Sequence, residues 1–271
     1  MKKQRKNIGI ILTLIISLFI ISGCLQVDTV IRVNKDGSGA VERTFTMQKD
    51  ILEMIKAMSS MDTGQGQEAE DFNLLNREEL ALEAGSMGEG VKLLSAEPYE
   101  TDLFEGYKAV FSFSDINSLQ INQNPGESVP SEASEGDVVK EIVTFSFKKG
   151  NPSKLSIFMP NDYPSEESED LSEPEELQAE ELEMIKQIYS NMRMTMSVEV
   201  DGAIESTNAV HQAESRITLM ELDLSQVVKD EEKLKQVASS KMDTIEGLKD
   251  VLEDIPGIKV ELQDTVEVLF R

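Results

Sequence analysis

Alternating apolar and polar residues predict a β-hairpin over residues 25–47. The turn between the two runs reads Asn-Lys-Asp-Gly-Ser-Gly. A two-residue Asp-Gly turn would mix buried and exposed side chains across the pair. A three-residue loop with Gly37 in the left-handed conformation instead pairs Ile31 with Val41. The same register places Val27 opposite Phe45. Because the buried face sets the register, we expect the three-residue loop.

Helical spacing of apolar residues predicts a helix over residues 49–60, and we expect its methionines to lie in the core. The stripe consists of Ile51, Met54, Ile55 and Met58. Asn76 is the expected N-cap of a second helix that runs to about Ala84, with Glu79 in the capping-box position. Further helices are expected at 175–190, 231–239 and 245–255.

Short alternating runs predict the remaining strands. They lie at 91–97, 107–112, 138–148, 154–159, 193–200, 203–209, 217–224, 258–262 and 265–270. We expect 193–200 to pair with 203–209, and 258–262 to pair with 265–270. The fold class expected from this order is α+β: an antiparallel β-sheet with helices packed on one face, plus a small C-terminal helix-helix-strand-strand unit.

Composition divides the chain further. Residues 161–183 hold eleven acidic residues and no basic ones, which is typical of a solvated segment. A cation-binding acidic cluster is the alternative for this segment. The expected organisation is a leader (1–23), an N-terminal α+β region (24–160), an acidic linker or loop (161–174), a helix and strands that complete the domain (175–224) and a C-terminal tail unit (225–271).

The first residues have the anatomy of a secretory signal. A basic start is followed by the apolar run 8–21, which is short for a membrane span. The run ends in Ile21-Ser22-Gly23-Cys24, which resembles the bacterial lipobox. That resemblance implies cleavage after Gly23, a diacylglyceryl group on Cys24 and acylation, for instance by palmitate, of the new amino terminus. An uncleaved anchor helix is the alternative, and either one places the remainder outside the cytoplasmic membrane.

The net charge limits the partners that the protein can bind, and the residue after Cys24 indicates the membrane in which the protein lies. The whole chain has 26 basic and 51 acidic residues, and the leader holds four of the basic ones, so the mature part has a net charge of −29. Nucleic-acid binding needs a basic surface and is therefore excluded as a function. Leu25 replaces the Asp that retains many lipoproteins in the inner membrane. We expect the outer membrane in a Gram-negative host, and otherwise the outer face of the cell membrane.

The inventory of reactive side chains argues against an enzyme. Cys24 is the only cysteine and His211 the only histidine, and His211 lies in a polar run expected to be a loop. A zinc site or a Ser-His-Asp triad has too few partners. No phosphate-binding or dinucleotide motif is present, so we expect no cofactor. A carboxylate pair for hydrolysis stays possible, because 51 acids offer many pairs.

Two stretches allow a metal interpretation. Asn34, Asp36 and Ser38 alternate as in a calcium loop, but Phe45 stands where that loop needs a bidentate Glu, so a hairpin turn is favoured. Met192, Met194 and Met196 alternate, and clustered thioethers bind Cu(I). Filling the buried face of a strand is the simpler interpretation of these methionines, and we favour it.

The mature sequence also resembles a family. The Asp36-Gly37-Ser38-Gly39 hairpin, the segment from Val200-Asp201-Gly202 to the strand at 217–224, and the tail around Pro256-Gly257 are similar to the LppM-domain lipoproteins. The resemblance implies an α+β lipoprotein domain without an assigned reaction, and some such proteins carry a C-terminal membrane segment.

Together these observations predict a non-enzymatic envelope lipoprotein that binds a hydrophobic ligand, a lipid or a protein partner. A structural lipoprotein without a ligand cavity is the alternative.

Overall fold

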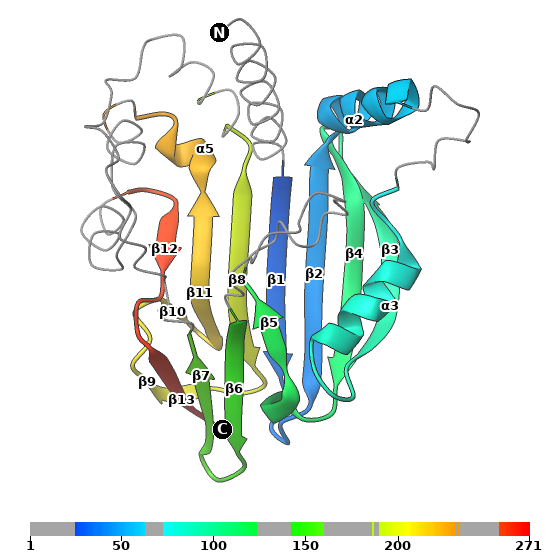
Figure 1. Cartoon of the computed structure of the whole chain (residues 1–271). Coiled ribbons are helices and arrows are strands. Elements are labelled where there is room, and N and C mark those ends of the chain that lie inside the picture. Colours follow the sequence, from blue (N-terminus) through cyan, green and yellow to red (C-terminus); the bar gives the residue numbers. More distant parts are fainter. Residues whose placement is uncertain are drawn as a thin grey trace, which may run out of the picture.

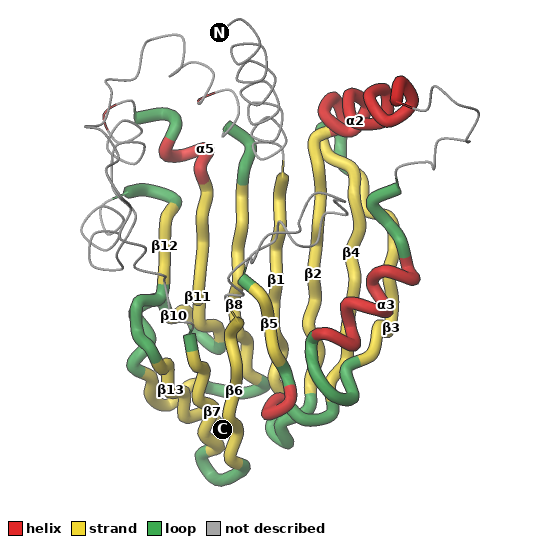
Figure 2. Tube along the Cα trace, in the orientation of Figure 1, coloured by secondary structure: helices red, strands yellow, loops and turns green. Residues whose placement is uncertain are grey.

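The computed structural model of the chain describes residues 25–62, 73–123, 142–159, 186, 190–230, 232 and 255–271. The leader with Gly23 and Cys24 and the acidic linker 161–174 lie outside these residues, as do nearly all of the helices expected at 175–190, 231–239 and 245–255. The described part is an α+β structure made mostly of strands (Figure 2), which confirms the fold class at that level. The strands form two sheets (Figure 1).

The large sheet has eight strands, and its long strands run side by side across the molecule (Figure 1). Its order is β10 (Gln212–Ala213), β11 (Arg216–Asp223), β8 (Arg193–Val200), β1 (Leu25–Val33), β2 (Gly39–Gln48), β4 (Phe104–Phe113) and β3 (Lys92–Glu100), with β12 (Ile258–Val260) paired to β11. The small sheet has the order β5 (Gln120–Asn122), β6 (Ile142–Lys148), β7 (Ser153–Phe158), β13 (Thr265–Phe270) and β9 (Ile204–Thr207).

The N-terminal hairpin forms in the predicted register. Ile31 lies opposite Val41 and Val27 opposite Phe45. The Asn34 N–H donates to the Ser38 carbonyl at 2.8 Å, which closes a loop of three residues. Gly37 has a φ of 89°, in the left-handed region that favours glycine. The prediction of loop length, register and glycine conformation is therefore confirmed.

The prediction of a single antiparallel sheet is wrong. Two sheets form, and at the centre of the large one β1 pairs in parallel with β8, from Gln26 opposite Arg193 to Val33 opposite Val200. Strand β8 does not pair with β9 as expected; its partners are β1 and β11, whereas β9 pairs with β13. Alternation shows which face of a strand is buried, but it carries no information about the neighbouring strand.

The last two strands also differ from the prediction of a self-contained strand pair. Strand β12 joins the large sheet beside β11, and β13 inserts between β7 and β9 in the small sheet. Both strands exist close to the expected places. The two strands do not pair with each other because each pairs with the edge of a different sheet and packs against that sheet's apolar face. The segment 255–271 therefore connects the two sheets.

Three described helices accompany the sheets. Helix α2 (Lys49–Asp62) follows β2 directly, and α5 (Leu224–Val227) is a single turn after β11. Helix α3 (Arg77–Ser86) begins at Asn76, whose side chain accepts hydrogen bonds from the N–H groups of Glu78 and Glu79. The predicted N-cap is confirmed. A 3₁₀ turn at Ile116–Ser118 leads into strand β5, which is not among the strands that the alternating runs predict.

The main core lies between the two sheets and beneath α3. One face of the large sheet, here called the inner face, carries Ile31, Val41, Phe111 and Val198. The small sheet contributes Val143, Ile157 and Val268, and α3 contributes Leu80 and Ala84. Figure 1 shows the small sheet and α3 side by side on this face. Helices therefore cover only part of the inner face, and a second sheet covers another part. Among the described residues, no helix is both long and apolar enough to span a bilayer.

Candidate functional site

The end of the large sheet where β1 begins is the candidate attachment site. Leu25 is the first residue of β1 and lies opposite Met47. Cys24 and Gly23 lie outside the described residues, but Leu25 is bonded to Cys24, so no spacer separates the predicted lipidation site from the central strand. Leu25 and Val27 are buried in the core cluster. The fold therefore begins directly after the predicted cleavage position.

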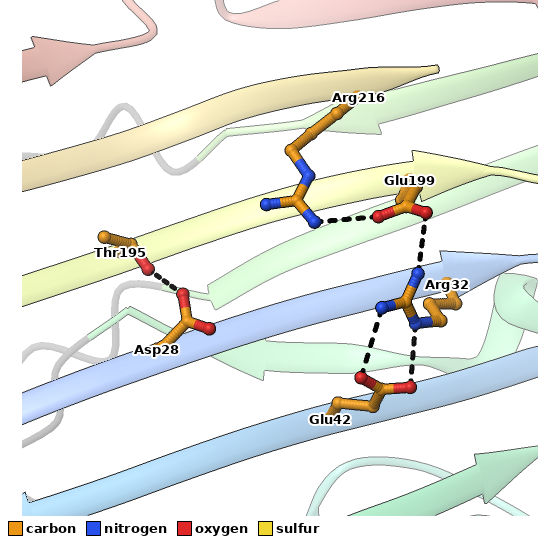
Figure 3. A network of polar contacts seen from close by, with 6 residues as sticks. All are labelled: Asp28, Arg32, Glu42, Thr195, Glu199 and Arg216. Atoms are coloured by element: carbon orange, nitrogen blue, oxygen red, sulfur yellow. Dashed lines mark hydrogen bonds and ion pairs between the residues drawn. The ribbon is translucent and has the colours of Figure 1, made fainter. Parts of the chain in front are cut away.

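A chain of charged side chains crosses the opposite, outer face of the large sheet (Figure 3). Arg32 on β1 donates from Nε to Glu42 on β2 at 2.7 Å and from Nη1 to Glu199 on β8 at 2.7 Å. Arg216 on β11 donates to the other oxygen of Glu199 at 2.8 Å. The network thus joins four neighbouring strands. Nearby, the Thr195 hydroxyl donates to Asp28, again between β8 and β1.

The charges of this network determine what chemistry it allows. Hydrogen bonding to Glu42 raises the pKa of Arg32. The hydrogen bond from Arg216 is the largest cause of the lowered pKa of Glu199, and Arg32 adds to it. A carboxylate with a lowered pKa stays ionised at neutral pH and has no proton to donate, so Glu199 is unsuited to act as a general acid. The arrangement is suited to holding strands in register.

A second polar cluster fixes α3 on the inner face. The buried Arg43 of β2 forms an ion pair with Glu83 of α3 and lies over the Phe111 ring, 5.9 Å from its centroid. Burial raises the pKa of the neighbouring Tyr107 hydroxyl to about 12. Arg77 of α3 also donates to the Ala96 carbonyl on β3, the edge strand. This cluster is a buried clamp between helix and sheet, and it restricts pairing at that edge.

The methionines proposed for copper are brought together only in part. Met194 and Met196 share the inner face of β8, where Met196 is buried in the core cluster and lies opposite Met220. Met192 precedes the strand, and its carbonyl accepts the N–H of Leu224. Core packing accounts for the position of Met196, while copper binding by these residues stays untested.

His211 lies in the bend before β10, as its polar surroundings predicted, and its carbonyl accepts the N–H of Thr218. The buried Glu261 of the tail lies near this bend. Its carboxylate accepts the N–H groups of Val210 at 2.8 Å and Gln263 at 3.1 Å. The buried carboxylate of Glu261 thus has backbone N–H groups as hydrogen-bond partners, and the bond from Val210 attaches the C-terminal segment 255–271 to the segment before β10.

Metal binding has little support among the described residues. No group of three His, Cys, Asp or Glu side chains there is placed to hold a metal ion. In the hairpin loop, Asp36 accepts bonds from the N–H and the hydroxyl of Ser38, and Asn34 donates to the same hydroxyl. These side chains are used to stabilise the turn. The acidic segment 161–183 lies outside the described residues.

Sequence reasoning missed the outer-face network. Its members alternate on their strands as polar residues should, so each was visible as a solvent-facing position. What was missing is the strand order, because Arg32 meets Glu199 only when β1 and β8 are neighbours. One sequence signal points to the network: two strands each carry a solvent-facing charged residue, the charges are opposite, and both residues stand near the same end of their strands.

Comparisons with known proteins add one similarity. No family model matches the chain, and no curated protein matches it. A similar solved structure is the NMR structure of the folded domain of LppM from Mycobacterium tuberculosis, with 14% sequence identity, coverage of 92% of this chain and 91% of that chain, and a TM-score of 0.33. What the chain does is therefore inferred from its own residues.

Proposed function

We propose that the protein is a lipoprotein of the cell envelope, held by a lipid on Cys24 on the outer side of the membrane. The observation that carries the proposal is the lipobox-like Ile-Ser-Gly-Cys sequence followed at once by β1, which starts at Leu25. A cleaved leader explains why a basic and apolar segment stands directly before the central strand. Acylation also explains the lone cysteine, because it removes a free thiol from an oxidising compartment.

The protein is proposed to act by binding, without catalysis. Its partners under this proposal are the membrane, through the lipid, and a hydrophobic ligand or another envelope protein. Three features favour this class: the single cysteine stands at the proposed attachment site, the single histidine lies in a bend, and Glu42 and Glu199 are paired with arginine. A copper site at the methionines and a carboxylate hydrolase remain weaker alternatives.

Metabolic labelling tests the attachment. The whole chain, expressed in a bacterium fed an alkyne-bearing palmitate analogue, is expected to take up label and to sediment with membranes. Cys24→Ser removes the lipid acceptor and is expected to abolish labelling. Thr13→Ser, in the apolar run, keeps the lipobox and serves as the matched control. Labelling that persists in Cys24→Ser contradicts the proposal.

Native mass spectrometry tests the binding role. The protein is isolated in mild detergent from its own host, and its mass is compared with that of the acylated chain alone. A co-purified lipid, or a defined protein partner, supports the binding function. A chain that carries only its own acyl groups under conditions that preserve complexes argues for the structural alternative.

A further inference from the structure

Helix α2 leaves part of its apolar stripe uncovered by the core, and Met54 is the most exposed described member of that stripe. At about 100° per residue, Ile51, Met54 and Ile55 lie on one face of the helix. Among the α2 residues whose side chains are described, 49–57, the buried one is Leu52, which lies about 100° around the helix from Ile51 and is 2% exposed. Met54 is 38% exposed, and both isoleucines are only partly buried. A helix that packs only against its own protein normally buries such a stripe.

A second exposed apolar side chain lies beside the start of this helix. Leu103, in the turn between β3 and β4, is 63% exposed. Its carbonyl accepts the N–H of Lys49, the first residue of α2, at 3.0 Å. Figure 1 shows α2 lying crosswise over the ends of β2 and β4, at the end of the sheet where β1 begins. Apolar groups from a helix and a turn thus share one end of the molecule.

The two lysines of α2 are paired with acidic side chains within the protein, and the other charged residues of this helix are acidic. Lys49 binds Glu100 at 2.6 Å, and Lys56 lies 3.9 Å from Glu105. Lys49 also lowers the pKa of Glu100 through this hydrogen bond. The described residues at this end of the sheet therefore offer no excess of basic groups to anionic headgroups. Any surface that it contacts must be recognised through apolar contact.

The position of Cys24 specifies that surface. Leu25 is bonded to Cys24 and pairs with Met47, and α2 begins two residues after Met47. One residue spans about 3.8 Å between Cα atoms, so a lipid on Cys24 holds this end of the sheet at the bilayer. Strands that rise from the bilayer would place the crosswise α2 parallel to its surface, which is how amphipathic helices bind it.

We infer that α2 and Leu103 form a bilayer-contacting surface, with Met54, Ile55 and Leu103 seated among the lipid headgroups. This inference rests on the proposed attachment at Cys24. It assigns α2 the role of a second membrane contact, which orients the domain with its sheets standing away from the lipid. Because the contact is apolar, it forms on zwitterionic lipid and is insensitive to salt.

Depth-dependent fluorescence tests this inference. The whole acylated protein is reconstituted in phosphatidylcholine vesicles that contain nitroxide-bearing lipid. Lipidation of Cys24 leaves no other thiol, so Met54→Cys and the control Leu82→Cys each introduce one labelling site. Leu82 is a matched control because it is a 78% exposed leucine on α3. We expect nitroxide to quench the position-54 reporter about two-fold more strongly than the position-82 reporter, in low and high salt alike.

The outcomes separate the two proposals. The mass of the N-terminal peptide first establishes whether Cys24 is acylated in each variant. Acylated protein with equal, weak quenching at both positions overturns the role of α2 and leaves the lipid attachment standing. A chain with unmodified Cys24 overturns both the attachment and the inference that rests on it.

Discussion

Leu25 on β1 lies opposite Met47 on β2, so the residue bonded to Cys24 and the start of α2 share one end of the large sheet. The other end carries the hairpin loop at Gly37 and the C-terminal end of β8 at Val200. Between them the sheet is held by the inner core and by the outer-face network. These features give expectations that can be measured on the detergent-solubilised protein.

Removing the partner of the buried Arg43 should destabilise the fold. In Glu83→Gln the guanidinium loses its counter-charge while it stays buried between α3 and the sheet. We expect a loss of about 2–3 kcal/mol in the free energy of unfolding, measured by urea titration. Glu78→Gln, an exposed carboxylate on the same helix, is the control and should change it by less than about 0.5 kcal/mol. Equal effects in both variants would contradict the clamp.

Replacing glycine by alanine should destabilise the protein at Gly106 and stabilise it at Gly85. A Cβ on Gly106 would meet the Phe45 carbonyl oxygen at 2.0 Å, so Gly106→Ala must push β4 away from β2. A Cβ on Gly85, in α3, meets nothing within 4 Å. Gly85→Ala should therefore stabilise the protein by up to about 1 kcal/mol, because alanine favours the helix. Thermal unfolding of both variants tests the pair, and a Gly106→Ala protein as stable as the parent would be incompatible with this register.

The network predicts a pH dependence that involves Glu199. Its pKa is lower in the folded protein than its ordinary value of 4.5, chiefly through Arg216. A lowered folded pKa means that the carboxylate stabilises the protein above its ordinary pKa and that this stability disappears as the pH falls through the folded value. The parent should thus be more stable than Glu199→Gln at neutral pH, and the difference should shrink as the pH falls below 4.5 and through the lowered pKa of Glu199.

The control for this prediction is the same Glu199→Gln substitution made in a protein that already carries Arg216→Gln. In Arg216→Gln, Glu199 keeps Arg32 but loses the partner that lowers its pKa most. The same Glu199→Gln substitution should then have a smaller effect at neutral pH. A difference between parent and Glu199→Gln that stays constant from pH 7 to pH 3 would show that the ion pairs do not contribute.

Core packing and copper binding predict different responses of the β8 methionines. Met196 is buried opposite Met220, whereas Met194 is only partly buried. Met196→Ala should cost about 3 kcal/mol in unfolding free energy, and Met194→Ala clearly less. A midpoint that rises on addition of copper(I), and that no longer rises in Met194→Leu, would support the metal site instead.

Local sequence patterns predicted most of the helices and strands, but they did not predict which strands pair with each other. The hairpin register followed from the apolar positions Val27 and Ile31, and α3 from Asn76 as a cap, because both depend on neighbours in the sequence. The parallel pairing of β1 with β8 depends on a partner 167 residues away. Strand β5 was missed because Gln120–Asn122 offers one buried residue, Ile121, in a polar run.

The candidate site was predictable to the same degree. Cys24 follows from a contiguous motif, so it needs no knowledge of the fold. The partly exposed stripe on α2 has the same spacing as a fully buried one, and its periodicity therefore predicted a core helix, which is wrong for Met54. Only the placement of Leu52 toward the sheet reveals that Met54 faces outward. Which side of an amphipathic helix is covered depends on tertiary structure.

The interleaving of distant segments sets the order in which the molecule can fold. As the chain is made from its amino end, β1 exists long before its parallel neighbour β8, and β7 and β9 both exist before β13, the strand that must enter between them. Until then the edges of β7 and β9 carry unpaired backbone groups, which attract other chains. The newly made polypeptide is therefore most prone to aggregation in the interval before β13 arrives.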